Sequence, residues 1–256
     1  LAHADVLAAL GRTVNAVRAY LRAVTIEPDA PDARAGLASA YLELDEPEQA
    51  LPHARRAVEL YNAPVAAKPD SAATDQAQAP GTGAPAGTDP AERRRRAAQA
   101  HASYGVALSL NDEHELAIEQ YELAAELYDE PPTELFINWA NSLGVLERYT
   151  EMENTLRFVI TGGSPSALAH ERLGFALFRQ RRLDAAARHF REAVAMDPRH
   201  FPALNGLGIV ILNDYVASDP PDQALRIQAL NLLRRSLRIE ANQQRITELV
   251  SRFDRG

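Results

Sequence analysis

Residues 167–199 read ALAHERLGFALFRQRRLDAAARHFREAVAMDPR, and two amphipathic segments lie on either side of the polar break at 180–182. In the first segment, apolar residues recur from Leu173 onwards at the i, i+3, i+4 spacing of one helical face. Residues 183–194 repeat this spacing in the second segment. Pro198 ends the second helix, because the residue before a proline avoids the α region. The stretch therefore predicts two helices joined by a short turn.

Small and aromatic residues occupy fixed places in this stretch. Gly174 and Ala186 are small where two helices would approach closely, and Phe190 is the large side chain that would pack there. Together with Leu173 and Pro198, they fall at the spacing of a 34-residue helix-turn-helix unit. The stretch therefore resembles a tetratricopeptide repeat. The resemblance implies an all-α fold, an α-solenoid of tandem helix-turn-helix repeats.

The repeat template extends over nearly all of the chain. The positions that match it are Gly11, Ala16, Tyr20, Ala23 and Pro28 in a truncated repeat 1, Leu37, Ala38, Tyr41, Ala50 and Ala57 in repeat 2, Tyr104, Gly105, Leu108, Ala117, Tyr121 and Ala124 in repeat 3, Ile137, Ala140 and Asn141 in a degenerate repeat 4, and Leu204, Leu207, Gly208, Ile211, Ala229, Leu233 and Ser236 in repeat 6. In repeat 6, residues 213–222 are expected to lengthen the loop between its helices. Residues 242–253 carry apolar side chains on one face and predict a C-terminal capping helix.

One segment without periodicity interrupts the repeats. Residues 63–91 are rich in Ala, Pro, Gly and Thr and offer almost nothing large to bury, so a flexible linker or insertion is expected there. Three regions are therefore expected: N-terminal repeats 1 and 2 in residues 1–62, the linker, and repeats 3 to 6 with the capping helix in residues 92–256. The sequence leaves open whether the linker separates two arrays or loops out of one.

Helix starts are predicted from capping motifs. Asp112-x-x-Glu115 and Thr150-x-x-Glu153 both fit a capping box, in which the first residue accepts from the backbone and the last reaches back. Ser164 precedes a proline and predicts the N-cap of the following helix.

Composition excludes several classes of protein. The chain has 256 residues, 46% of them hydrophobic, and no cysteine, so it has neither a disulfide framework nor a thiolate metal site. No apolar run approaches the length of a membrane span, and no signal peptide is visible. The chain starts at Leu1, within the expected first helix, so an upstream segment is expected and export stays open. A soluble, cytoplasmic protein is the default expectation.

Charge is distributed unevenly along the chain. Residues 1–166 carry 25 acidic and 13 basic residues, a net charge of −12, whereas residues 167–256 carry 10 and 14, a net charge of +4. A compositional preference for arginine explains this most simply, and the functional alternative is a basic C-terminal half that meets an acidic partner. The arginine run at 93–96 is expected to be the solvated start of a helix with an acidic group nearby. A basic stripe with interleaved aromatics is absent, so no nucleic-acid partner is expected.

No catalytic or metal site is predicted. The seven histidines are scattered, and none stands in a metal-ligand pattern. The sequence has no glycine-rich nucleotide loop and no local nucleophile motif. We therefore expect a non-catalytic chain without metal or cofactor.

The resemblance implies a partner-binding groove lined by the first helix of successive repeats. Groove positions carry large side chains in repeats 4 to 6 but mostly Ala, Gly and Ser in repeats 2 and 3. The residues expected to bind a partner are Asn138, Trp139, Arg172, Phe175, Phe178, Arg179, Asn205, Ile209 and Asn213. An amphipathic helix or hydrophobic peptide, which could be acidic, suits this groove. The competing interpretation is that some of these apolar side chains pack between repeats.

Two functional hypotheses follow. The leading one is a non-enzymatic scaffold that binds a protein or peptide. The alternative is the substrate-recruiting or regulatory repeat portion of a larger enzyme, such as a transferase or kinase, whose catalytic domain lies outside this chain. The identity of the partner and the oligomeric state are not readable from the sequence.

Overall fold

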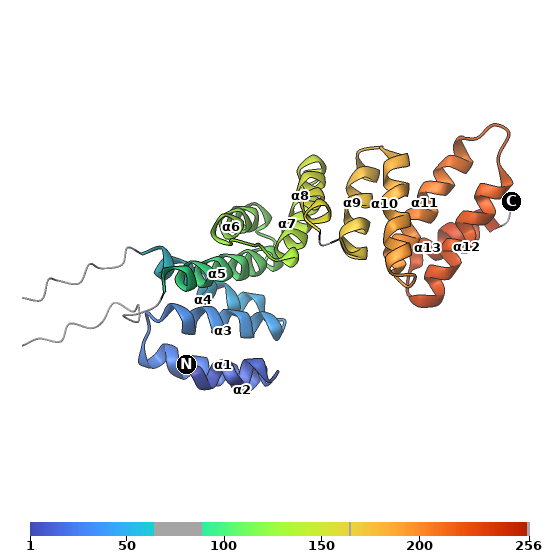
Figure 1. Cartoon of the computed structure of the whole chain (residues 1–256). Helices are drawn as coiled ribbons and strands as arrows, with labels where there is room; N and C mark the ends of the chain where they lie inside the picture. The colour runs from blue at the N-terminus through green and yellow to red at the C-terminus, as the bar shows by residue number, and fades with distance from the viewer. Residues whose placement is uncertain (64–88, 164, 255–256) are drawn as a thin grey trace, which may run out of the picture. The chain divides into compact units, whose positions relative to one another are not determined.

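The computed structural model describes residues 1–63, 89–163 and 165–254. Within these residues it consists of 13 α-helices and contains no strand, which confirms the predicted all-α solenoid fold (Figure 1). The helices are α1 (Ala2–Ala9), α2 (Thr13–Ile26), α3 (Pro31–Glu43), α4 (Pro47–Asn62), α5 (Pro90–Leu110), α6 (His114–Leu127), α7 (Thr133–Val145), α8 (Tyr149–Thr161), α9 (Ala167–Arg179), α10 (Leu183–Met196), α11 (Phe201–Ala217), α12 (Gln223–Ile239) and α13 (Gln244–Asp254). None of the described helices is long and apolar enough to cross a membrane.

The chain divides into two compact units. Unit 1 is Leu1–Leu135 and contains α1–α6 with the start of α7, and unit 2 is Phe136–Gly256 and contains the rest of α7 with α8–α13. Within each unit, helices that follow one another in the chain pack side by side, as α3 and α4 or α9 and α10 do (Figure 1). The first helices of successive repeats also contact each other: α1 with α3 and α3 with α5 in unit 1, and α9 with α11 in unit 2. These first helices form the layer on which the resemblance places the groove.

An aromatic side chain of the second helix packs against glycines of the first helices. Phe190 of α10 lies between Gly174 of α9 and Gly206 of α11, and a Cβ atom added to these glycines would stand 2.8 Å and 2.5 Å from its ring. The Phe190 ring is 3% exposed. Tyr20 makes the corresponding contact with Gly36 in unit 1. The expected close approach of helices around Phe190 is confirmed, and it requires glycine because any side chain would overlap the ring.

In repeats 1 to 5, the two helices are joined by a turn with one left-handed residue. The turn residues with positive φ are Gly11 (67°), Asp45 (59°), Asp112 (62°), Glu147 (57°) and Arg181 (64°). In each of these turns the next amide donates back to a carbonyl of the first helix, as Arg182 N does to Leu177 O at 2.9 Å. This bond is the closing bond of a Schellman motif. The backbone of the turn therefore also sets where the second helix begins.

The two capping-box predictions are wrong for this reason. The N-cap residues of α6 and α8 are Glu113 and Arg148, and neither makes a side-chain cap hydrogen bond. Asp112 occupies the left-handed turn position, and Thr150 lies inside α8. The predicted N-cap Ser164 lies outside the described residues, but the prediction is wrong, because the N-cap of the following helix α9 is Ser166, which accepts from the Ala169 amide at 3.1 Å.

Glu153 serves a different purpose from helix capping. It is 3% exposed, and its carboxylate accepts from Arg182 Nη1 at 2.7 Å, from Arg157 Nη2 at 2.7 Å and from Gln180 Nε2 at 2.9 Å. Burial alone would raise the Glu153 pKa, but the hydrogen bonds from Gln180 and Arg182 and the two guanidinium charges outweigh burial and lower it. The carboxylate therefore ties α8 to the turn between α9 and α10.

The insertion in repeat 6 is helical in its first part. The expected loop at residues 213–222 is wrong for residues 213–217, which continue α11 to Ala217. The connection resumes as α12 at Gln223, where Asp222 accepts from the Ala224 amide as the N-cap. The added residues therefore lengthen the first helix as well as the loop. The C-terminal helix α13 packs on α12, as the capping-helix prediction requires.

The predicted linker lies almost entirely outside the described residues. α5 begins at Pro90, earlier than residue 92, and the carboxylate of Asp89 caps it by accepting from the Ala91 amide at 3.2 Å. The helices that flank the linker, α4 and α5, pack against each other within unit 1. The division into residues 1–62, 63–91 and 92–256 stays a prediction.

The arginine run at 93–96 is bound within unit 1. Arg93 donates to the carbonyl of Tyr61 at 3.1 Å, and Arg96 forms an ion pair with Asp32 of α3. The acidic neighbour expected for this run is therefore present, and it joins α5 to α3.

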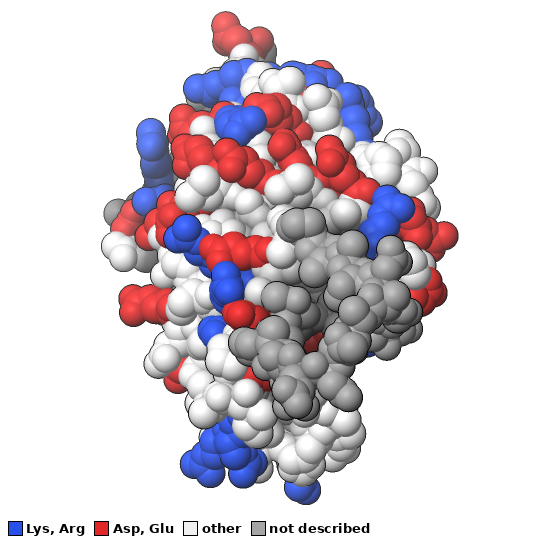
Figure 2. All heavy atoms as spheres, turned by 90° about the vertical axis from the view of Figure 1, so that its left-hand side faces the viewer, with Lys and Arg blue, Asp and Glu red and all other residues white. Residues whose placement is uncertain are grey.

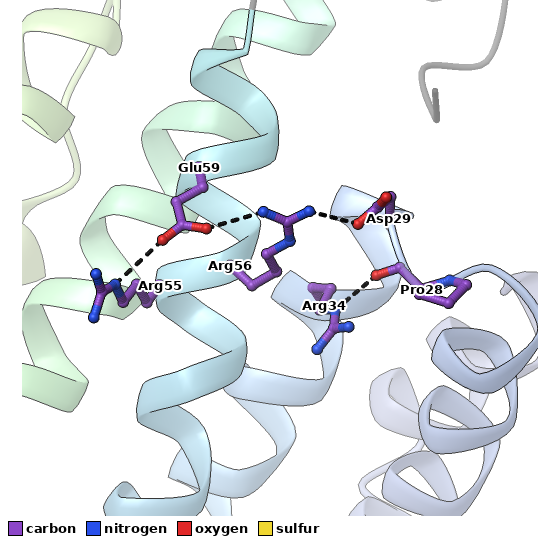
Figure 3. Close-up of polar contacts among 6 residues, drawn as sticks. All are labelled: Pro28, Asp29, Arg34, Arg55, Arg56 and Glu59. Atoms are coloured by element: carbon purple, nitrogen blue, oxygen red, sulfur yellow. Dashed lines mark hydrogen bonds and ion pairs between the residues drawn. The ribbon is translucent and has the colours of Figure 1, made fainter. Parts of the chain in front are cut away.

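Arginines also hold the loops between repeats at their prolines. Arg34 Nε of α3 donates to the Pro28 carbonyl at 2.9 Å (Figure 3). In unit 2, Arg235 of α12 donates to the carbonyl of Pro198. Both prolines end the second helix of a repeat, so each loop is fixed by the helices that follow it.

An exposed ion-pair network adds to the first of these loops. Arg56 of α4 binds the carboxylate of Asp29 at 2.7 Å and that of Glu59 at 3.0 Å, and Arg55 binds Glu59 at 3.2 Å (Figure 3). Exposed pairs of this kind contribute little to stability, because solvent screens their charges. The network therefore positions the loop more than it stabilises unit 1.

Candidate functional site

Two of the predicted groove residues of α9 form a cluster with the turn before α8 and the first residue of α8. The guanidinium of Arg179 lies over the Tyr149 ring at 4.5 Å and over the Phe175 ring at 5.8 Å. The two rings meet edge to face with centroids 6.2 Å apart. Arg179 Nη2 also binds the Glu147 carboxylate at 2.8 Å. We call these four residues, Glu147, Tyr149, Phe175 and Arg179, the arginine–aromatic cluster.

Trp139 belongs to a second group of rings. Its indole stacks on Phe136 with centroids 6.2 Å apart, and Phe136 in turn lies 5.0 Å from the Phe158 ring of α8. The indole Nε1 is buried and has no hydrogen-bond partner among the described residues. The ring neighbours described for Trp139 and for Phe175 are different, so the structure does not join these two predicted anchors through a ring contact.

The predicted polar rim residues have local partners. Asn205 Nδ2 donates to Gln243 Oε1 at 2.6 Å, which links α11 to the segment before α13. Asn213 Nδ2 donates to the carbonyl of Ile209 in its own helix at 3.1 Å. Arg172 lies 3.4 Å from the carboxylate of its neighbour Glu171.

The remaining predicted anchors are partly covered. Phe178 and Ile209 are half-buried on α9 and α11, as is Asn138 on α7. Of the nine predicted residues, the structure brings together Phe175 and Arg179, which are adjacent on one face of α9.

A cleft in unit 1 was missed by the sequence analysis. It has a volume of about 460 Å³ and is lined by the first helices α1, α3 and α5 together with two tyrosines of the second helices. The charged and aromatic residues that line it are Asp5, Tyr20, Asp32, Glu43, Tyr61 and Arg96. We call it the unit 1 cleft.

Hydroxyl groups organise the carboxylates of the unit 1 cleft. The Tyr20 hydroxyl donates to Asp5 Oδ1 at 2.8 Å, and the Tyr61 hydroxyl donates to Asp32. Burial, the hydrogen bond to Asp5 and the negative charges nearby raise the pKa of Tyr20. Across the floor, the hydroxyls of Ser39 and Ser103 lie 3.4 Å apart. The only signal for this cleft in the sequence is an acidic residue at some groove positions. The predicted site was based on large side chains, so it did not include these acidic residues.

Charged groups are mixed on the face of the molecule shown in Figure 2, where acidic and basic side chains are interspersed. The acidic excess of residues 1–166 is therefore not a single continuous patch on that face. Electrostatic arguments about a binding site must be made from individual groups and their partners.

A buried and a half-buried histidine lie against each other in unit 2. Nδ1 of His170 on α9 lies 3.0 Å from Nδ1 of His189 on α10. Burial lowers the pKa of both, and for His189 the charges of His170, Arg157 and Arg188 act in the same direction. In the part of the chain that the structure describes, no group of three or more His, Cys, Asp or Glu side chains could hold a metal ion.

Family profiles match two parts of the sequence. Profiles described as tetratricopeptide repeat match residues 1–72 and residues 167–200. No curated protein matches the sequence.

Solved structures share the fold at low sequence identity. YrrB, a tetratricopeptide-repeat protein with an unusual peptide-binding site, is 18% identical, with a TM-score of 0.60 over 91% of this chain and 98% of YrrB. The C-terminal part of a tetratricopeptide-repeat-containing protein from Cytophaga hutchinsonii is 14% identical, with a TM-score of 0.64 over 94% of this chain and 79% of its own. PilF from Pseudomonas aeruginosa is 18% identical, with a TM-score of 0.53 over 88% of this chain and 89% of its own.

Proposed function

We propose that this chain, a tetratricopeptide-repeat protein, is a non-catalytic scaffold that holds a protein or peptide partner in the groove of its first helices. Repeat arrays of this kind create extended concave surfaces by stacking identical units. The peptide-binding site of YrrB, a protein with the same fold, supports a peptide as the partner. An amphipathic helix or a hydrophobic peptide fits the apolar groove side chains.

The observation that carries the proposal is the arginine–aromatic cluster on α9. Aromatic residues and arginine supply most of the energy of protein interfaces. Here Arg179 is already fixed by Glu147 and by the rings of Tyr149 and Phe175. A side chain that is ordered before binding loses less conformational entropy when a partner arrives.

The proposed site extends from this cluster over the first helices of repeats 4 to 6. Trp139, Phe175 and Phe178 are the proposed apolar anchors. The proposed surrounding residues are Asn138, Arg172, Arg179, Asn205, Ile209 and Asn213. The half-buried state of Trp139 and Phe178 leaves part of each ring available for contact.

Peptides selected from a random phage-displayed library on the whole chain provide the ligand for a test. The affinity of a selected peptide is measured by calorimetry for the unmodified chain and for Phe175→Ala and Arg179→Ala. Each substitution is expected to weaken binding about thirtyfold, since a hot-spot residue contributes about 2 kcal/mol. Thermal unfolding followed by circular dichroism shows that the variants are folded.

Met196→Ala is the matched control, because Met196 is an exposed apolar residue on the second helix α10. It is expected to leave the affinity unchanged. The proposal is wrong if the selected peptides bind both cluster variants as tightly as the unmodified chain, or if Met196→Ala weakens binding as much as they do.

A further inference from the structure

The unit 1 cleft has the size and the floor of a site for a small extended ligand. Its volume of about 460 Å³ falls within the range of roughly 300–1,000 Å³ that is usual for ligand sites. Gly36, Ser39 and Ala40 of α3 and Ala8 of α1 line it. These small side chains leave room for a chain segment to lie against the helices.

The charges of the unit 1 cleft are not balanced at one end. Asp32 is neutralised by its ion pair with Arg96. Asp5 and Glu43 have no ion-pair partner among the described residues, where they accept hydrogen bonds only from neutral hydroxyls, Tyr20 at 2.8 Å and Thr13 at 3.0 Å. This end of the cleft therefore carries two uncompensated negative charges.

Asp5 and Glu43 line the same cleft although they come from different helices. Asp5 is on α1 and Glu43 is the last residue of α3. Both line the cleft together with Tyr20, whose hydroxyl donates to Asp5 at 2.8 Å, and both negative charges raise the pKa of Tyr20. Each carboxylate is exposed and can accept about four hydrogen bonds, of which one is used by a hydroxyl. The remaining acceptor capacity is open to a cationic donor.

We propose that the unit 1 cleft binds a basic peptide segment, with the cationic head of one lysine or arginine side chain between Asp5 and Glu43. The aliphatic stem of such a side chain lies over the small residues of the floor, while its charge neutralises the two carboxylates. The proposal rests on the proposed function in that the occupant is a peptide. It assigns a second site, in unit 1. The ligand of this site is basic, whereas the partner considered for the C-terminal half is acidic.

The test uses fluorescein-labelled peptides of Gly, Ser and Ala that differ only at two central positions, which hold Lys, Gln or Glu. Fluorescence anisotropy with the full chain at low ionic strength is expected to show binding of the Lys peptide. The Gln and Glu peptides are expected to bind at least tenfold more weakly. Absence of binding by the Lys peptide at millimolar concentration, or equal binding of the three peptides, overturns the proposal.

The key variant is Asp5→Asn with Glu43→Gln, which removes both charges but keeps acceptors for the Tyr20 and Thr13 hydroxyls. It is expected to weaken binding of the Lys peptide at least tenfold. The control is Glu48→Gln with Glu119→Gln, because these residues are exposed acids of the second helices α4 and α6. This control removes the same charge from unit 1 and is expected to keep the affinity. Equal losses in both double variants would mean that net charge alone attracts the peptide, and would overturn the site.

Two further measurements separate this proposal from its alternatives. Arg179→Ala, in unit 2, is expected to leave binding of the Lys peptide unchanged, so failure of the unit 2 site and failure of this site are distinguishable. Spermidine tests whether the cleft recognises any free polycation. A peptide ligand is excluded if spermidine binds the unmodified chain more tightly than the Lys peptide does, and if the Asp5→Asn, Glu43→Gln variant weakens spermidine binding as much as it weakens peptide binding.

Discussion

Single residues in left-handed turns set where helices end in this molecule. Arg181 has a φ of 64° in the turn between α9 and α10, is exposed, and is followed by the Arg182 amide that closes the motif. A non-glycine residue in this region is strained by about 1–2 kcal/mol, because its Cβ approaches the following carbonyl. Glycine avoids this strain, although its greater freedom in the unfolded chain offsets part of the gain.

Arg181→Gly is therefore expected to stabilise unit 2 by about 1 kcal/mol. Trp139 is the only tryptophan and lies in unit 2, so urea unfolding followed by its fluorescence reports on that unit. Gly11→Ala is the reciprocal control, because Gly11 has a φ of 67° and open space around its Cα. It is expected to lower the stability of unit 1, followed by circular dichroism. A destabilised Arg181→Gly chain would show that the arginine side chain makes a stabilising contact that outweighs the strain.

At the scale of helices, the contact between α10 and α11 depends on Gly206 having no side chain. A Cβ atom at Gly206 would stand 2.5 Å from two atoms of the Phe190 ring, which is held on its other side by Gly174. Because the ring is enclosed, it cannot move away. Gly206→Ala is therefore expected to destabilise unit 2 by about 1–3 kcal/mol, the usual cost of overpacking.

Trp139 fluorescence during urea unfolding measures this loss, and two variants test its cause. Phe190→Leu in the Gly206→Ala background is expected to cost less than the sum of the two single changes, because the two residues are in contact. Gly144→Ala is the control: its added Cβ would meet only the flexible Met152 side chain, at 3.3 Å. If Gly144→Ala and Gly206→Ala have equal effects, backbone propensity and not the Phe190 contact is responsible.

The packing of helices was predictable from sequence wherever one short stretch contained all of the contacting residues. Phe190 and Gly174 lie within one repeat, so their spacing alone predicted the contact that the structure shows. The start of α8 was predicted wrongly from Thr150 and Glu153, because the backbone of the preceding turn sets it and no side-chain cap is involved. The capping motif also gives no sign that the Glu153 carboxylate instead accepts a hydrogen bond from Arg182 of the next repeat.

The candidate sites, too, were predictable only where one short stretch of sequence contains the contacting residues. Phe175 and Arg179 lie on one face of α9, so the sequence placed them together. Their partners Glu147 and Tyr149 come from the turn before α8 and from the start of α8, which local spacing does not relate to α9. In the unit 1 cleft, Asp5 and Glu43 converge only because α1 and α3 pack side by side. Small groove residues look uninformative in the sequence, yet they are what leaves the cleft open.

At the scale of the whole molecule, each unit contains one buried and one half-buried histidine that favour the neutral form. They are His53 and His101 in unit 1 and His170 and His189 in unit 2, and burial is the main cause of the lowered pKa at all four. A histidine whose pKa is lower in the folded state stabilises the fold fully above its ordinary pKa of about 6.5. This contribution is lost as the pH falls below that value, because the unfolded chain takes up protons more readily.

Both units are therefore expected to lose stability as the pH falls below about 6.5, before it reaches the range in which ordinary carboxylates are protonated. In unit 2 the effect has a clear structural origin. The Nδ1 atoms of His170 and His189 are 3.0 Å apart, so one must accept a hydrogen bond from the other, and protonating the acceptor removes it. Glu192 favours the charged form of both rings, whereas Arg157 and Arg188 oppose it at His189.

His189→Gln tests this assignment, because glutamine can still donate to or accept from His170 but does not titrate. The urea midpoint of unit 2, read from Trp139 fluorescence at each pH, is expected to vary less with pH in this variant than in the unmodified chain. His3→Gln removes an exposed histidine of unit 1 and is expected to leave the pH dependence of both units unchanged. If unit 2 of the His189→Gln chain retains its full acid sensitivity, the histidine pair is not its source. The buried network of Glu153 would then be the next group to examine, since its lowered pKa makes its contribution disappear only at more acidic pH.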